Sequence, residues 1–229
     1  MTGFDLIVFD CDGVVVDSEI IAAQYEAKLL SEAGYPIEPH QMAERFAGMT
    51  WKDILLAIEK EADIPLSASL LEKSEKALDQ KLANGVKGIP GVRKAAMQIA
   101  LPRCICSNSK PHRIEAMLKR TGTLDLFKDR FFSAAEVGEK RPKPAPDVFE
   151  YAAEKMGVDP ARTVVVEDSA HGVEGARAAN MRVIGFTGAS HTYPSHADQL
   201  TEAGAETVVN RMEDLPPTVT ALSSWSGVL

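Results

Sequence analysis

The sequence predicts an α/β protein, with a doubly wound parallel sheet as its core and a small all-helical domain inserted after the first strand. Two observations predict this fold class. Short apolar segments alternate with helical patterns through most of the chain, and such alternation is typical of a parallel sheet with helices on both faces. Four successive helix-like segments interrupt the alternation after the first strand. The 229 residues, 45% of them apolar, are enough for a substantial core.

The first strand is predicted at residues 4–10, FDLIVFD, because this segment is short and almost continuously apolar. From Ser18 to Ala33 the apolar spacing becomes helical, and Gly34 follows. Three further helical segments are expected at 38–47, 50–62 and 66–84. Residues 18–85 are therefore predicted to form the helical domain, and residues 1–17 with 86–229 to form the α/β core.

The remainder of the chain predicts helices and strands in alternation. Helices are expected at 91–100, 111–121, 146–157 and 170–179. Strands are expected at 103–106, 131–133, 163–166 and 182–186, with a last edge strand at 205–209.

Charge and cysteine content narrow the classes of partner and compartment. The net charge of −8 and the pI near 5.2 argue against a nucleic-acid or membrane partner, because such proteins usually carry a basic patch. Three cysteines form an odd set, and Cys104 and Cys106 would share one face of a strand, where a disulfide is unfavourable. The sequence has no basic leader and no apolar run of membrane length. We expect a soluble cytoplasmic protein, and the oligomeric state stays open.

Carboxylates and small polar residues stand at the ends of three predicted strands, where open α/β sheets bind ligands. Asp10 and Asp12 follow the first strand, Ser107-Asn108-Ser109 the second, and Glu167-Asp168-Ser169 the strand at 163–166. Burying two carboxylates one residue apart is costly unless a positive partner is present. Acidic oxygens that converge at one edge imply a hard cation, most simply Mg²⁺.

The segment EKRPKPAPDVF, at 139–149, adds Lys140, Arg141 and Lys143 in a proline-stiffened loop. A lysine held near a metal and a hydroxyl suits a phosphoryl group, because the transition state of phosphoryl transfer spreads negative charge over its equatorial oxygens.

These four segments, in this order, resemble the motifs of the haloacid dehalogenase superfamily. The first is DCDGVVVD at 10–17, and the others are the Ser107 strand end, KPAP at 143–146 and VEDS at 166–169. The resemblance covers nearly the whole chain and points to the C1 branch, whose helical cap lies between the first two motifs. It implies a Rossmann-like core, and within the branch the chain is similar to sugar-phosphate phosphatases of the 6-phosphogluconate phosphatase and β-phosphoglucomutase-like group.

The resemblance also implies a role for each motif residue. Asp10 is expected to be the nucleophile that forms an aspartyl-phosphate, and Asp12 the general acid and then the base. Mg²⁺ is expected to be bound by Asp10, by the backbone carbonyl of Asp12 and by Asp168, with Glu167 either a ligand or a support. The phosphoryl oxygens are expected to contact Ser107, Asn108 and Lys143.

Each of these groups also has a purely structural interpretation. Two acids at the start of a helix suit its macrodipole, and serine and asparagine after a strand form turns or helix caps. Lys143 would then be a solvated loop charge. Asp17 is interpreted as a hinge or turn anchor, and most of the five histidines as surface or packing residues.

The residues that the motifs contain, and the residues that they lack, limit the reactions that are expected. An acid at position 12 favours phosphoryl transfer, because an alcohol leaving group needs a proton. β-Phosphoglucomutases carry a histidine five residues after the first motif, where this chain has Ala22, and G-x-S-R in the cap, where it has Gly48-Met49-Thr50-Trp51. Hydrolysis of a small phosphate ester is therefore expected, with a mutase and a non-catalytic metabolite-binding module as the alternatives.

The cap is expected to close over the site on linkers near 14–18 and 84–90. Its loop at 45–53, RFAGMTWKD, supplies the expected substrate contacts Arg45, Gly48, Trp51 and Lys52. Trp51 would lie against a sugar face or pack between cap helices, and Arg45 or Lys52 would contact a second anionic group.

Overall fold

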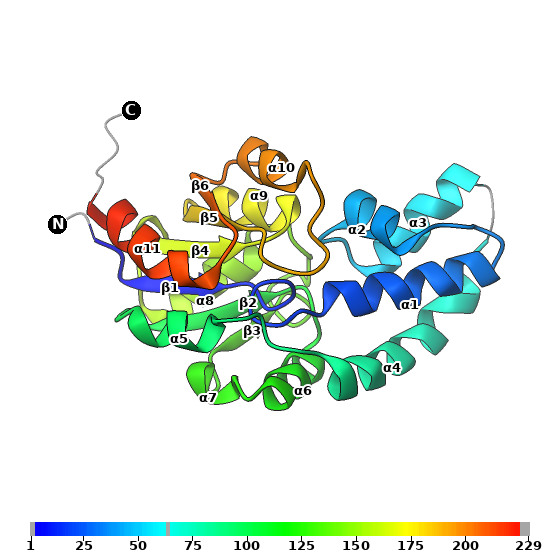
Figure 1. Ribbon diagram of the computed structural model, residues 1–229, viewed down its shortest axis with the longest axis horizontal. Helices are drawn as coiled ribbons and strands as arrows, with labels where there is room; N and C mark the ends of the chain where they lie inside the picture. The colour runs from blue at the N-terminus through cyan, green and yellow to red at the C-terminus, as the bar shows by residue number, and fades with distance from the viewer. Residues whose placement is uncertain (1–2, 63–64, 225–229) are drawn as a thin grey trace.

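The computed structural model describes residues 3–62 and 65–224, so the chain ends assigned above to the core domain, 1–2 and 225–229, lie outside the described residues. Six strands form one parallel sheet in the order β3-β2-β1-β4-β5-β6 (Figure 1). The strands are β1 (Leu6–Phe9), β2 (Arg103–Ser107), β3 (Phe131–Ser133), β4 (Thr163–Glu167), β5 (Arg182–Phe186) and β6 (Thr207–Val209). The predicted α/β fold class is confirmed.

The two central strands, β1 and β4, are buried along their whole length. Val8 of β1 lies opposite Cys104 of β2 on one side and Val165 of β4 on the other. The chain builds the sheet outward from β1 to β3, then crosses to β4 and continues to β6. The direction of winding therefore reverses between β1 and β4, which is where sheets of this kind bind ligands.

Helices cover both faces of the sheet, because successive side chains of a strand point to opposite faces. Ile7 and Phe9 belong to one buried cluster, and Leu6 and Val8 to a second one. The helices of this part are α5 (Val92–Gln98), α6 (Pro111–Thr121), α7 (Leu124–Phe127), α8 (Asp147–Met156), α9 (Ala170–Ala178), α10 (His196–Glu202) and α11 (Leu215–Ser224). Two short 3₁₀ helices lie at Pro160–Arg162 and Met212–Asp214.

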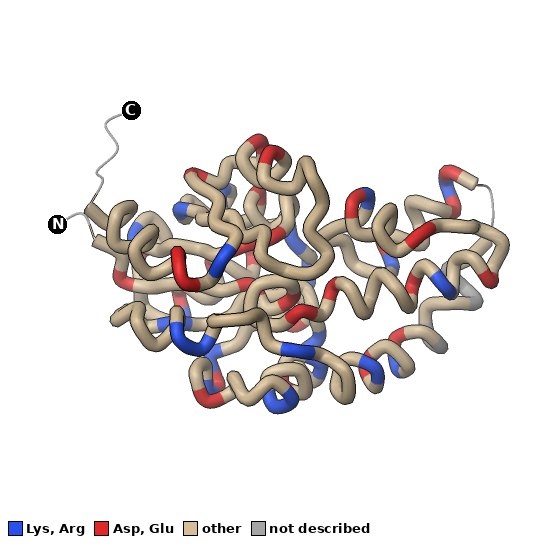
Figure 2. The backbone as a smooth tube through the Cα atoms, viewed as in Figure 1, with Lys and Arg blue, Asp and Glu red and all other residues tan. Residues whose placement is uncertain are grey.

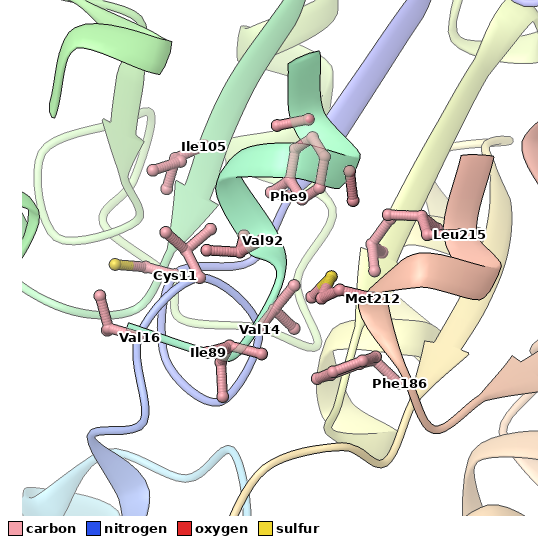
Figure 3. Packing of buried hydrophobic residues seen from close by; sticks show 14 of the residues in the cluster. Phe9, Cys11, Val14, Val16, Ile89, Val92, Ile105, Phe186, Met212 and Leu215 are labelled. Carbon is pink, nitrogen blue, oxygen red and sulfur yellow. The ribbon is translucent and has the colours of Figure 1, made fainter. Parts of the chain in front are cut away.

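The loop after β1 is itself part of the core. Figure 3 shows Cys11, Val14 and Val16 of this loop packed among Ile89, Val92 and other side chains of the first cluster. All three are fully buried. Apolar packing therefore fixes the backbone that carries Asp10 and Asp12.

Four helices form a second body beside the sheet, which we call the helical insert (Figure 1). They are α1 (Glu19–Glu32), α2 (Pro39–Phe46), α3 (Trp51–Ala62) and α4 (Ser67–Gly85). The insert has its own buried cluster, which includes Leu30, Leu55 and Ile58. These helices agree with the four predicted from apolar spacing.

The two linkers of the insert run side by side. Val16 pairs with Gly88 in an antiparallel bridge, and the Asp17 N–H donates to the Lys87 carbonyl over 2.8 Å. The Asp17 carboxylate also accepts from the backbone N–H of Ser190 over 3.1 Å. This contact fits the interpretation of Asp17 as an anchor where the chain leaves the core.

Charged residues are spread over both bodies, with acidic and basic positions interspersed (Figure 2). No helix within residues 3–62 and 65–224 combines the length and hydrophobicity that a membrane span requires. Cys11, Cys104 and Cys106 are free and buried, so their thiols act as small packing groups.

Candidate active site

Three carboxylates meet at the carboxyl end of the two central strands. Asp10 directly follows β1, Glu167 is the last residue of β4, and Asp168 follows it. Because β1 and β4 are parallel neighbours, these residues lie at the same edge of the sheet. One oxygen atom from each carboxylate lies within 4.8 Å of the others, and all three residues are buried.

Lys143 is the buried cation of this cluster, at 5% exposure. Its Nζ donates to Asp10 Oδ1 over 2.6 Å, to the Cys106 carbonyl over 2.9 Å and to Glu167 Oε1. Burial alone would lower the pKa of Lys143, but the Asp10 and Glu167 carboxylates raise it above its usual range. The lysine is therefore charged, and it neutralises part of the cluster.

The remaining negative charge leaves the cluster suited to a metal ion. Burial raises the pKa of Asp10 and of Asp168 well above their usual value, neighbouring carboxylates raise both further, and Lys143 offsets only part of this. A divalent cation would relieve this repulsion. The donor atoms are all carboxylate oxygens, which is the ligand type that Mg²⁺ prefers.

Asp12 is not part of this carboxylate cluster and is held by hydroxyl groups. Its Oδ1 accepts from Ser18 Oγ over 2.7 Å, and its Oδ2 accepts from Ser107 Oγ over 3.0 Å and Ser109 Oγ over 2.9 Å. Ser107 is fully buried and directed at Asp12. Its predicted contact with phosphoryl oxygens stays a prediction, and the structure adds Ser109 to the site.

Two histidines for which the sequence predicted no site role lie against Asp168. His191 Nε2 is 3.2 Å from Asp168 Oδ2, and His196 Nε2 donates to the Asp168 backbone carbonyl. Both rings are buried, and burial lowers the pKa of His196. His191 follows the end of β5, so reading the polar residues after every strand, including β5, would have found it.

Gly13 lets Asp168 approach the loop after β1. Its φ of +76° is in the left-handed region, and a Cβ at this position would lie 1.7 Å from Asp168 Oδ2. Only glycine satisfies both conditions, which explains why the first motif carries this residue after Asp12.

A cavity of about 260 Å³ lies between the carboxylate cluster and the helical insert. Asp10, Asp12, Asp168, Asn108 and Lys143 line its core side.

Three of the four predicted contacts of the insert, Gly48, Trp51 and Lys52, also line the cavity. Trp51 packs against the insert cluster as well, and its Nε1 donates to Ser74 Oγ over 2.7 Å. Arg45 lies outside the cavity, because its guanidinium is held by the Tyr35 hydroxyl and the Glu61 carboxylate.

The insert is closed over the core in this structure. The Gly48 carbonyl accepts from Asn108 Nδ2, and the Ala47 carbonyl accepts from His171 Nδ1, each over 3.2 Å. Asn108 Oδ1 accepts from the backbone N–H of Lys143 over 2.9 Å. One asparagine thus joins the insert to the loop that carries the lysine.

Two acids of α1, Glu19 and Glu26, also line the cavity. They were not among the predicted site residues, because α1 reads as an ordinary amphipathic helix.

The comparisons with known proteins agree with this geometry. A family model for haloacid dehalogenase-like hydrolases matches residues 4–180. The 6-phosphogluconate phosphatase of Escherichia coli K12 is 27% identical over 195 residues, covering 85% of this chain and 87% of that protein. Hexitol phosphatase B of the same organism is 30% identical over 195 residues, covering 77% and 81%. A crystal structure of a conserved haloacid dehalogenase-like protein from Agrobacterium tumefaciens has 63% identity and a TM-score of 0.90, covering 97% and 100%.

Proposed function

We propose that this chain, which belongs to the haloacid dehalogenase-like hydrolases and acts on phosphate esters, is a sugar-phosphate or polyol-phosphate hydrolase. We propose that it works through an aspartyl-phosphate on Asp10. The observation that carries the proposal is the buried cluster of Asp10, Glu167 and Asp168 around Lys143, at the point where the sheet reverses its winding.

Asp10 is the proposed nucleophile. Lys143 binds Oδ1 and keeps the carboxylate in place, while Oδ2 accepts no hydrogen bond from residues 3–62 or 65–224. An oxygen of Asp10 attacks phosphorus, the bond from phosphorus to the leaving oxygen breaks, and the phosphoryl group is transferred to Asp10. Lys143 counters the negative charge that builds on the phosphoryl oxygens.

Asp12 is the proposed general acid and base. It gives a proton to the leaving alcohol in the first step. In the second step it takes a proton from the water whose oxygen attacks phosphorus, while the bond between phosphorus and Asp10 breaks and phosphate is released. The hydroxyls of Ser18, Ser107 and Ser109 suit both states, because a hydroxyl either donates to a carboxylate or accepts from a carboxyl.

Asp10 and Asp168 are the proposed metal ligands, with the Asp12 backbone carbonyl, and Glu167 contributes as a ligand or as the group that holds Lys143. The cation, proposed to be Mg²⁺, would neutralise negative charge on the phosphoryl group when bound. His191 and His196 keep Asp168 directed at this position.

The helical insert is the proposed cap, with bounds at 18–85 and hinges in the two paired linkers. Its contacts at Ala47 and Gly48 close the cavity, which keeps bulk water from the phosphorylated aspartate while the leaving group is present. The substrate of the enzyme is proposed to be a small phosphate ester, and the enzyme is proposed to lie in the cytoplasm.

The residues of α1 that line the cavity favour a hydrolase over a mutase. Ala22 lines the cavity at the position where β-phosphoglucomutases carry a histidine. Its methyl group cannot transfer a proton. The retention of Asp10, Asp12 and Asp168 in one site supports an enzyme over a binding module.

The test is phosphate release from a panel of sugar and polyol phosphates, with Mg²⁺ and with EDTA. We expect Asp10→Asn to lower release at least about a thousandfold, because it removes the nucleophile. Asp5→Asn is the matched control, since Asp5 lies just before the other end of β1 and pairs with Arg162 on the surface.

Release that needs Mg²⁺ and is lost only in Asp10→Asn supports the proposal. Conversion of β-glucose 1-phosphate into glucose 6-phosphate, without release, would establish the mutase instead. Equal activity of Asp10→Asn and wild type would exclude the aspartyl-phosphate.

A further inference from the structure

The part of the cavity formed by α1 holds two carboxyl groups that the proposed chemistry does not use. Glu19 and Glu26 are seven residues apart, which is two helical turns, so both project from one face of α1. Glu26 is 8% exposed and lines the cavity. Neither carboxyl has a hydrogen bond or an ion pair to any residue within 3–62 or 65–224. A buried polar group without a partner in the protein is one that a ligand can satisfy.

The basic residues that line the cavity are mostly paired already. Lys143 is bound to Asp10 and Glu167, Lys110 to Glu75 over 2.6 Å, and Arg113 to Asp79 over 2.6 Å. Arg113 lowers the pKa of Glu26 through its charge, but it makes no ion pair with it.

Lys52 differs from these three. It lies exposed on the first turn of α3 and makes no ion pair to a described residue. The α1 side of the cavity therefore presents two acids, and the bases that act on Glu19 through their charge, His191 and Arg113, are themselves engaged with Asp168 and Asp79.

We propose that Glu19 and Glu26 set the substrate class, so that the enzyme takes the monophosphate of a neutral polyol or sugar and rejects a leaving group that carries a carboxylate or a second phosphate. This inference rests on the proposed hydrolase function and names the substrate class of that same site.

Hydroxyl groups fit this pair of acids in every protonation state. A hydroxyl donates to a carboxylate and accepts from a protonated carboxyl, whereas an anion fits only the protonated form. Burial raises the pKa of Glu26 to about 8 and that of Glu19 to about 7. Near neutral pH the pair thus carries part of a negative charge, and an anionic leaving group would have to meet that charge or force the uptake of a proton.

The inference differs from the sequence expectation, in which Arg45 or Lys52 would contact a second anionic group. Arg45 is held by Tyr35 and Glu61, outside the cavity. Lys52 lines the cavity, so the experiment has to separate its effect from that of the two acids.

The experiment compares sorbitol 6-phosphate with 6-phosphogluconate, which differ only in a CH₂OH group against a carboxylate. We expect kcat/KM to favour sorbitol 6-phosphate about 10-fold or more in the wild type. In the double variant Glu19→Gln, Glu26→Gln, the ratio is expected to fall at least about fivefold, because carboxamides donate to a carboxylate and carry no charge.

Two control variants keep the comparison specific. Glu32→Gln changes the net charge on the same helix, where Glu32 pairs with Lys28 on the surface, and is expected to leave the ratio unchanged. Lys52→Gln is expected to do the same. Melting temperatures of all variants show that each is folded.

A wild-type enzyme that prefers 6-phosphogluconate, or accepts both esters equally, overturns the inference while the hydrolase function stands. The inference is also overturned if the folded double variant keeps the wild-type ratio of kcat/KM values, or if Lys52→Gln lowers that ratio as much as the double variant is expected to. No phosphate release from either ester or from p-nitrophenyl phosphate would overturn the proposed function itself, and the inference with it.

Discussion

The carboxyl of Glu26 makes the stability of the protein depend on pH. Burial first, and then the neighbouring charge of Glu19, raises its pKa from the usual 4.5 to about 8. Between these two values the unfolded chain loses this proton while the folded protein keeps it, so unfolding becomes easier as the pH rises. Below pH 4.5 both states are protonated and the effect vanishes.

Glu26→Gln is therefore expected to gain stability over the wild type as the pH rises from 5 to 8. The gain in the free energy of unfolding is expected to be on the order of 2 kcal/mol. Urea denaturation of both proteins at the two pH values measures it. Glu32→Gln should show no such trend, and a difference between wild type and Glu26→Gln that is equal at both pH values would contradict the prediction.

His191 is expected to position Asp168 rather than to act on substrate. His191→Ala removes the group 3.2 Å from Asp168 Oδ2 and is expected to raise the Mg²⁺ concentration for half-maximal activity about 10- to 100-fold. His191→Gln, which keeps an N–H donor, should restore part of this loss. His40→Asn is the control, since His40 is exposed on the insert. An unchanged Mg²⁺ requirement in His191→Ala would exclude the role.

At the scale of single residues, the sequence predicted those side chains whose polarity contrasts with their neighbours. Asp10 and the pair Glu167-Asp168 stand out because each directly follows a run of buried apolar residues. His191 and Glu26 do not stand out, because a loop histidine and a helix glutamate are ordinary until tertiary packing buries them. The same packing places Arg45 outside the cavity through its contacts with Tyr35 and Glu61, which no local pattern predicts.

Among the elements, the loop between α2 and α3 controls how closely the insert approaches the core. Gly48 has a φ of +76°, and a Cβ there would lie 2.7 Å from both Cβ and Oγ of Ser169. Gly48→Ala is expected to push the insert away and to lower kcat/KM about 10-fold, because closure is incomplete. Steady-state kinetics measures this.

Gly34→Ala is the matched control for this substitution. Gly34 also has a positive φ, of +97°, but a Cβ there would meet nothing within 4 Å. Both variants carry the same kind of backbone strain, and only one has the clash. An equal loss of activity in the two would assign the effect to strain in the insert and not to its contact with Ser169.

Most elements could be predicted because their apolar spacing is regular, as in β3, β5 and α6, whose bounds agree with those expected. The helices α7, α10 and α11 were not predicted. α11 carries three consecutive β-branched residues, Thr218-Val219-Thr220, which disfavour a helix locally. Burial of Leu215, Val219 and Leu222 in the first core cluster stabilises it instead.

For the whole molecule, we expect Mg²⁺ to stabilise the fold, because it relieves the repulsion among the three buried carboxylates. At a concentration about 100 times its Kd, the melting temperature should rise by about 5 to 10 °C. EDTA should reverse the rise, and Asp168→Asn should show little of it. A similar rise in Asp168→Asn would place the binding elsewhere. Thermal unfolding with and without Mg²⁺ provides the measurement.

The paired linkers have a consequence for how such an enzyme changes over evolution. Val15–Asp17 and Lys87–Ile89 are hydrogen-bonded to each other, so both ends of the insert join the core at one place. A different helical insert could be joined to the core at these two neighbouring linkers, and the backbone of the core would not have to change. The proposed catalytic aspartates and the proposed substrate-selecting helices therefore lie on separable parts of the chain, and exchange of the insert is expected to change the specificity while the aspartates keep their geometry.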